Sequence, residues 1–506
     1  MRMIKNNLLF ILMCLFSFAG CSNYYYDLSV NNNKKSLSDP AITFFSFHPD
    51  ENSVLSVELE ARIKQDTSEI IIIAPVGSNI TANELNSRFT TEGLVYVNGK
   101  MQISGSNEHL YKDSVVYEVK SANGKNKKKY TVTVREHNST IYVNTNASNN
   151  GDGSSWTRAF KSLRDAIELA ELFPESKSKE IWIAAGTYKP GAGNNTEHYF
   201  PLTANTSYIG GFAGNETNIN QRVISFNRTI ISGDLGSGKY SYNLFGSFDD
   251  NIVNSINRDI TFDGIEFMSA KASSELDIRK FGTAINVFLD SEAALKIVNC
   301  VFNILEGSAI FALNGNAFLT DTVFNNITAN DIFGAVYIDS ENAEVKGCVF
   351  KNITGSALSI NGSIVSVENT QFSNITGAGA GSQALFVNST STDGSVIIKD
   401  LIIDGVSGGR GIYVTSYNSV LITETEIHDC SVASHGGGIY LNNFGQAEIS
   451  FTDFFNTTAI IGGSIFYMGE EENSSLLLID IRIDYAAIKN QSHQQMHLDG
   501  ENITVR

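Results

Sequence analysis

The feature that most constrains this chain is a repeat that begins near residue 260 and continues toward the C-terminal region. One repeated element is Phe-x-Asn, found at Phe324-Asn325-Asn326, Phe350-Lys351-Asn352, Phe372-Ser373-Asn374 and Phe454-Phe455-Asn456. A second element is Gly, a small residue and an apolar pair, as in Gly307-Ser308-Ala309-Ile310 and Gly355-Ser356-Ala357-Leu358. Self-similarity at a period of about 20 to 50 residues is typical of solenoids. The sequence therefore predicts stacked repeats over this region.

The spacing of the Asn residues gives the size of one repeat. Asn326 and Asn352 are 26 residues apart, and Asn374 follows after 22. We expect Asp404, Asp429 and Asn456 to occupy the next equivalent positions, so that one rung has 22 to 30 residues in three strands and three turns. Stacked rungs form parallel sheets with strands about 4.8 Å apart. Asn326, Asn352, Asn374 and Asn456 are then interpreted as structural residues of an amide ladder.

The distribution of proline supports this architecture. All six prolines lie at or before residue 201, and the last 305 residues contain none. Strands that are paired on both sides need every backbone N–H, which proline lacks. We therefore expect an all-β fold, a three-sheet parallel β-helix, over residues 140–506.

Two resemblances agree with this expectation. The segments "IYVNTNASNNGDGSSWTRAFKSLRDAIELA", "EIWIAAGTYKP" and "YIGGFAGNETNINQR" resemble the opening of right-handed parallel β-helix proteins of the pectin-lyase-like type. This resemblance implies that a helix around Leu163 and Ile167 caps the apolar end of the solenoid. The two repeated elements are also similar to repeats of chlamydial polymorphic membrane proteins, which are surface adhesins. That family places its Asn three residues after the Phe, whereas the gap here is two.

Residues 40–137 have a different sequence pattern, in which short apolar runs alternate with turns. A hairpin is predicted from Val115 to Lys120 and from Lys129 to Val134, with its turn at Asn123-Gly124. Ile70 to Ile73 form an apolar run long enough for a buried strand. The runs "AITFFSF" and "YTVTV" resemble the immunoglobulin-like or cadherin-like modules of bacterial surface lipoproteins. We expect a small immunoglobulin-like β-sandwich here.

The N-terminal segment has the pattern of a targeting signal. Arg2 and Lys5 precede an apolar stretch that is too short to span a bilayer, and the stretch ends in Phe18-Ala19-Gly20-Cys21. This ending resembles the bacterial lipobox, with Phe18 in place of the usual Leu. The resemblance implies a signal peptide over residues 1–20, lipidation of Cys21, and a lipid-anchored tether over residues 21–39. We therefore expect a bacterial outer-membrane or cell-surface location, with the lipid anchor in the membrane.

Charge and cysteine content limit the classes of partner. The formal net charge is −18, which argues against nucleic acid as the main partner because binding a polyanion needs a basic surface. Outside the signal segment the chain has three scattered cysteines, Cys300, Cys348 and Cys430. We interpret all three as small buried residues rather than as a disulfide framework.

The candidate chemistry lies between residues 399 and 435. If Asp404 and Asp429 share the ladder position, two carboxylates lie one rung apart and either raise one pKa or recruit a cation such as Ca²⁺. Lys399 and Arg410 lie on the same rungs, so this region is the candidate catalytic and metal site. The alternative is that both Asp residues replace Asn at solvated turns, which leaves the protein with no catalytic set and no required cofactor.

These observations favour a surface lipoprotein whose β-helix serves adhesion or glycan binding without catalysis. Its partner would be a polysaccharide or another ligand on a host or envelope surface. The alternative is a polysaccharide lyase or glycoside hydrolase that acts along the β-helix, since proteins resembling this fold often bind or cut polysaccharide on an exposed sheet.

Overall fold

The structure is a computed structural model. It describes residues 40–121, 124–249, 252–253, 255–272, 284–329, 333–377, 382–389, 391, 393–417, 419–443, 445–469, 474–484, 496–499 and 502–506. The predicted signal peptide, Cys21 and the tether lie outside the described residues, as does Asn123 of the predicted hairpin turn.

The first folded part, up to Glu136, is a β-sandwich. A six-stranded sheet has the order β3-β4-β11-β10-β7-β8, and a three-stranded sheet has the order β2-β1-β6, with a short pair β5-β9 beside them. The strands are β1 (Ile42–Phe47), β2 (Leu59–Glu60), β3 (Arg62–Lys64), β4 (Glu69–Ala74), β5 (Glu84–Asn86), β6 (Arg88–Thr91), β7 (Leu94–Val97), β8 (Lys100–Met101), β9 (Glu108–Leu110), β10 (Val115–Lys120) and β11 (Lys127–Glu136). The predicted hairpin is present as the antiparallel pair β10 and β11.

One helix follows the first strand of the solenoid. α2 (Leu163–Ala170) begins after Ser162, whose hydroxyl accepts a hydrogen bond from the backbone N–H of Asp165. Its apolar stripe includes Leu163, Ile167 and Ala170, and all of these side chains are buried in the solenoid core. The helix therefore covers apolar surface at the first rung, next to β12 (Thr140–Val143) and β13 (Lys179–Ala184).

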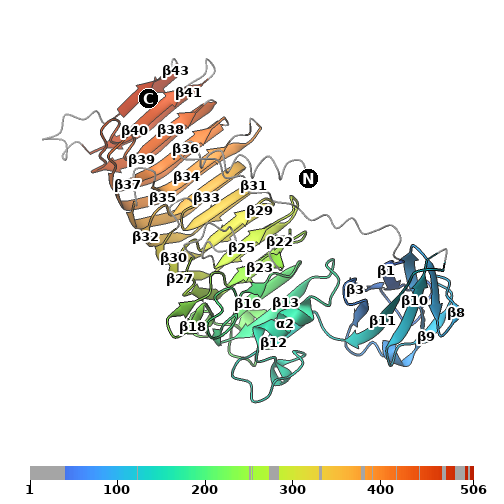
Figure 1. Ribbon diagram of the computed structural model, residues 1–506. Helices are drawn as coiled ribbons and strands as arrows, with labels where there is room; N and C mark the ends of the chain where they lie inside the picture. The colour runs from blue at the N-terminus through green and yellow to red at the C-terminus, as the bar shows by residue number, and fades with distance from the viewer. Residues whose placement is uncertain are drawn as a thin grey trace. The chain divides into compact units, whose positions relative to one another are not determined.

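From β12 onward the chain forms a right-handed parallel β-helix, and Figure 1 shows its strands stacked from β12 to β43. The register of neighbouring strands separates three parallel sheets. The first sheet contains β15 (Phe200–Pro201), β20 (Phe245–Gly246), β25 (Ile285–Phe288), β28 (Ile310–Leu313), the start of β31 (Val336–Lys346), the start of β33 (Leu358–Thr376), β34 (Gln383–Ser389), β36 (Arg410–Ser416), β38 (Ile439–Asn443), β40 (Ile465–Gly469) and β42 (Met496–Asp499).

The second and third sheets complete each rung. The second contains β12, β13, β16 (Thr206–Phe212), β23 (Ile260–Asp263), β26 (Ala294–Val298), β29 (Asn316–Thr320), the later part of β31, the middle of β33, β43 (Asn502–Val505) and the first parts of β35 (Ser395–Ser407), β37 (Ser419–Ser431), β39 (Gln446–Phe455) and β41 (Ser475–Ile483). The third contains β14 (Gly186–Tyr188), β17 (Thr229–Ser232), β24 (Ile265–Met268), β27 (Val301–Glu306), β30 (Val323–Thr328), β32 (Val349–Thr354) and the last parts of β33, β35, β37, β39 and β41.

The corners between strands are made by single residues with a left-handed backbone. One column joins the second sheet to the third and includes Asn299, Asp321, Gly347, Asn369, Asp400, Glu424, Phe451 and Asp480, with φ between 46° and 65°. A second column bends the third sheet and includes Ser269, Ile304, Asn326, Asn352, Asn374, Gly405, Asp429 and Asn456, with φ between 49° and 75°. Gly and Asn adopt this conformation most readily, so the repeated Asn is explained first by backbone geometry.

The second repeated element forms the corner that leads into the first sheet. Both residues of its apolar pair point into the core, because Ala309 and Ile310, like Ala357 and Leu358, are fully buried. Successive rungs share this pattern, with the register pairing Val336 to Leu358 and Leu358 to Leu385, so these rungs are 22 and 27 residues long. Within the described part of the chain, no helix is both long and apolar enough to cross a membrane.

Candidate functional site

The structure separates the residues that the sequence placed in one candidate site. Lys399 ends a strand of the second sheet and forms an ion pair with Glu424 at 3.4 Å. Asp404 lies on the third sheet, beside His428 of the next rung. Arg410 begins the first-sheet strand β36. The candidate set is therefore divided among three sheets.

The expectation that Asp404 and Asp429 share the ladder position is wrong by one residue. The register pairs Ser373 with Asp404 and Ile375 with Val406, which places Gly405 beside Asn374. In the next rung, Asp429 stands beside Gly405. A glycine takes the left-handed corner in this rung because it meets the same backbone requirement as Asn.

The Asn residues do share one corner, but their hydrogen bonds are staggered. Asn374 Nδ2 donates to Asn352 Oδ1 at 3.2 Å, and Asn456 donates to the carboxylate of Asp429. Asn352 instead donates to Asn325 at 3.0 Å, and Asn326 donates to Asn303 at 3.2 Å. Asp429 therefore has a structural partner in this column, while Gly405 interrupts the amide bonds.

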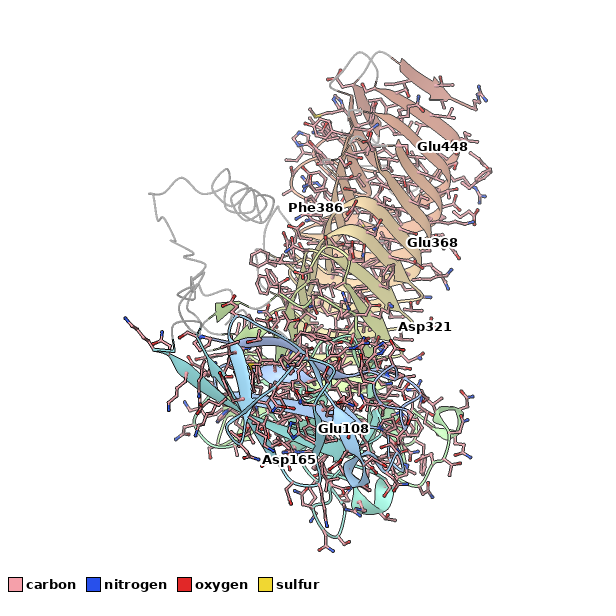
Figure 2. The ribbon with its side chains drawn as sticks, turned by 90° about the vertical axis from the view of Figure 1, so that its right-hand side faces the viewer. Glu108, Asp165, Asp321, Glu368, Phe386 and Glu448 are labelled. Atoms are coloured by element: carbon pink, nitrogen blue, oxygen red, sulfur yellow. The ribbon has the colours of Figure 1, made fainter. Side chains whose placement is uncertain are left out.

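The outer face of the first sheet gathers aromatic side chains that the sequence reading did not identify as a site. One position on successive strands gives the aromatic row, which comprises Phe386, Tyr413, Tyr440, Phe466 and His497. Neighbouring rings lie 4.7 to 5.2 Å apart between centroids. Figure 2 shows Phe386 on the opposite side of the stack from Glu368 and Glu448.

The sequence allows Tyr413 and Tyr440 either to stack on sugars or, as repeats of one inward-facing position, to lie in the core, and the favoured core interpretation is wrong. Both are half-buried and alternate with the fully buried Ile412, Val414 and Leu441. Two consecutive residues point inward at the corner before each strand, so the residue that follows them faces outward. The sequence signal for this row is the aromatic residue after the buried pair.

A polar row runs beside the aromatic row, two residues further along each strand. It comprises Asp339, Asn361, Asn388, Thr415 and Asn442, all of which are half-buried. Asn361 Nδ2 donates to the Tyr337 hydroxyl at 2.7 Å. The Asn442 Oδ1 atom is buried and has no hydrogen-bond partner among the residues that the structure describes.

Two titratable groups on this face have shifted pKa values. Burial raises the pKa of Asp339 to about 6. Burial also lowers the pKa of Arg410, whose guanidinium lies 5.1 Å from the Tyr413 ring centroid and 5.0 Å from that of Tyr440. Arg410 Nε donates to the His435 carbonyl at 2.9 Å, which holds the guanidinium at the aromatic row.

The described residues contain no cluster of three or more His, Cys, Asp or Glu side chains arranged to hold a metal ion. The predicted Ca²⁺ at Asp404 and Asp429 stays a prediction. His497 lies in β42, stacked on Phe466 at 4.8 Å.

Comparison with known proteins adds one structural likeness. No protein-family model matches the chain, and no curated protein sequence matches it. Among solved structures, the chain is similar to one described as the catalytic domain of GH87 alpha-1,3-glucanase D1068A in complex with tetrasaccharides, at 9% identity and a TM-score of 0.27. The likeness covers 92% of this chain and 86% of that chain.

Proposed function

We propose that this protein is a bacterial surface lipoprotein whose β-helix binds a glycan, without catalysis, along the outer face of the first sheet. The observation that carries the proposal is the pair of outward rows, one aromatic and one polar, each repeated once per rung. A sugar unit has an apolar face and a rim of hydroxyl groups. Aromatic surface and amide groups side by side match those two features.

The repeat distance supports a linear ligand. Strands of one sheet are about 4.8 Å apart, so equivalent side chains recur at that interval along the stack. A linear glycan that lies along the stack then meets an aromatic and a polar group together on three successive rungs, those of Phe386, Tyr413 and Tyr440.

The test is a glycan array and a polysaccharide-cleavage screen with residues 22–506, with and without Ca²⁺. Tyr413→Ala should weaken binding about threefold to tenfold, because an aromatic contact contributes about 0.5 to 1.5 kcal/mol beyond its area. Tyr417→Ala is the matched control, since Tyr417 is a 42% exposed tyrosine that follows the same strand. Equal binding by both variants, or no glycan binding at all, would contradict the proposal.

The anchor is part of the same proposal. Cys21 would carry the lipid that holds the chain at the membrane, and the mature N-terminus would be this residue. Cells that express the full chain should incorporate an alkyne-labelled fatty acid into it, and the Cys21→Ser variant should lose the label and leave the membrane fraction. A labelled Cys21→Ser protein would contradict lipidation at this position.

A second candidate function is favoured by Asp339. A half-buried carboxyl group with its pKa raised to about 6 on a ligand-binding face has the property of a general acid. If the protein cleaves polysaccharide here, activity should be present below about pH 6, fall above it, and be lost in Asp339→Asn. Cleavage that is lost instead in Asp404→Ala or Asp429→Ala would restore the site expected from sequence and would replace the non-catalytic proposal.

A further inference from the structure

A shallow cavity of about 580 Å³, wide open to solvent, lies away from the first sheet, at the corner between the second and third sheets. Its floor includes Val301 and Val323, which face outward from the third-sheet strands β27 and β30. Its wall comes from the loop between β16 and β17, through Ile219, Ile224 and Ser225. The volume is in the range of small-molecule sites.

The loop that forms the wall is built to hold a fixed conformation. The Glu216 carboxylate accepts hydrogen bonds from the backbone N–H groups of Ala213, Gly214 and Asn215. Burial opposes ionisation of Glu216, but these hydrogen bonds outweigh it and lower its pKa. A capping box between Asn218 and Gln221 fixes the next turn.

The loop also packs closely on the solenoid. Ile224 and Arg222 lie against Gly264, where a Cβ atom would come within 3.0 Å of Ile224 and 3.2 Å of Arg222. The Arg222 guanidinium forms an ion pair with Asp263, and Asn299 Nδ2 donates to the same carboxylate at 3.2 Å. The cavity therefore has a preformed wall and rim.

The lining combines apolar and polar groups. Val301, Val323 and Ile224 give it an apolar floor and wall, while Asn220, Asn299 and Asp321 supply amide and carboxylate groups at the rim. Phe226 follows Ser225 of the wall, and its ring is 85% exposed. Phe226 does not line the cavity itself, so its ring would contact only a ligand that extends past the edge of the wall.

We propose that this cavity is a second binding site, for a single neutral sugar unit or a short neutral oligosaccharide. A fully apolar ligand would remove water from the amide and carboxylate groups without replacing their hydrogen bonds. Arg222 is paired with Asp263, so its positive charge is already neutralised. The carboxylate of Asp321 therefore leaves a net negative charge at the rim, which would repel an anion. A neutral ligand with an apolar face and several hydroxyl groups satisfies both parts of the lining.

The site is separate from the aromatic row. Figure 2 shows Asp321 on the side of the stack that also bears Glu368 and Glu448, opposite Phe386. Two sites on opposite sides of one solenoid can be tested independently, because a substitution at one leaves the other unchanged.

The experiment screens residues 22–506 against neutral gluco-, galacto-, manno- and xylo-oligosaccharides on an array, followed by calorimetric titration of the strongest binder. Phe226→Ala and Asp321→Asn should each weaken binding about threefold or more. Their matched controls are Phe451→Ala and Asp480→Asn, which change an exposed ring and a carboxylate on the same corner column in other rungs. The controls and Tyr413→Ala should bind this ligand as the unmodified protein does.

The outcomes separate the two sites. Neutral-oligosaccharide binding that is weakened in Asp321→Asn but unchanged in Tyr413→Ala supports the second site, whatever happens on the first sheet. No binding of any neutral oligosaccharide, or full binding by Asp321→Asn, overturns it. Because the Phe226 ring is exposed, its removal should leave the unfolding temperature unchanged, which checks that a loss of binding is not a loss of fold.

Discussion

The left-handed corner residues show how single side chains meet a backbone requirement. Most positions in the column that bends the third sheet are filled by Asn, Asp, Ser or Gly, which tolerate positive φ. Ile304 is the exception, with φ 57° and 53% exposure. A β-branched residue is strained in this conformation, and its side chain gains little from burial.

Replacing this strained residue should stabilise the protein. Ile304→Asn is expected to raise the free energy of unfolding by about 1 kcal/mol, because a left-handed residue with a Cβ costs roughly 1 to 2 kcal/mol and Asn tolerates the conformation better. Urea unfolding measures the change. Ile364→Asn is the control, since Ile364 is 49% exposed in a regular strand, and no gain is expected there. An equal gain in both variants would mean that strain at Ile304 is not the cause.

The three cysteines lie directly after left-handed corner residues. Cys300, Cys348 and Cys430 are buried and free, and each thiol contacts the carbonyl two residues before it, at 3.3 to 3.5 Å. Thr322 and Thr370, on the rungs next to Cys348, make the same bond through their hydroxyl groups. Cysteine and threonine are therefore alternatives at this corner.

This equivalence predicts that Cys348→Thr changes the free energy of unfolding by less than about 1 kcal/mol. Burial raises the pKa of all three thiols to about 12, so the folded protein should not react with a thiol reagent at pH 8. Since the unfolded thiols ionise near pH 8.5, stability should fall as pH rises from about 9 toward 12. Rapid labelling of the folded protein, monitored by absorbance, would contradict this account.

At the scale of an element, the corner before the first sheet depends on small residues. Gly438 occupies the position that Ala357 and Ala384 fill in earlier rungs. A Cβ atom at Gly438 would come within 2.6 Å of the Ser464 carbonyl oxygen and 2.7 Å of the Phe454 ring. The next rung packs directly against the backbone of Gly438 and leaves no room for a side chain there.

Gly438→Ala should therefore destabilise the protein by about 1 to 3 kcal/mol through overpacking. Ala384→Gly is the matched change in the opposite direction, and it should cost only about 1 kcal/mol because it removes one methyl group and adds backbone freedom. Urea unfolding of both variants makes the comparison. A neutral Gly438→Ala would show that the corner can widen, contrary to the close contacts described here.

At the scale of the whole molecule, each strand inside the stack is hydrogen-bonded on both sides. Ser366 is an example, with Glu344 on one side and Ile397 on the other. Ser366→Pro should reduce the free energy of unfolding by about 3 kcal/mol or more, since proline removes a ladder hydrogen bond. Asn194→Pro, in the loop between β14 and β15, is the control and should have little effect on the urea midpoint. Equal effects of the two substitutions would argue against the two-sided pairing.

The architecture could be predicted from the sequence because every rung repeats the same structural requirements. Each rung needs a left-handed residue and small residues at its corners, so Asn and small residues recur at equivalent positions. Each strand also needs its backbone N–H groups for pairing, so proline is missing from the repeat region. The candidate site was harder to predict. Asp404 was placed one residue too early because Gly405 meets the backbone requirement without resembling Asn, and Tyr413 was assigned to the core because two consecutive inward residues at the corner shift the alternation.

Because equivalent residues of successive rungs pair in register, the length of the solenoid is proportional to the number of its rungs. Rungs of different lengths, such as those of 22 and 27 residues, each advance the stack by one strand spacing of about 4.8 Å. Insertion or deletion of one rung would lengthen or shorten the aromatic and polar rows by one strand spacing. The remaining rungs would keep their pairing. If the proposed glycan binding is correct, the length of glycan that the first sheet can span is set by the number of rungs.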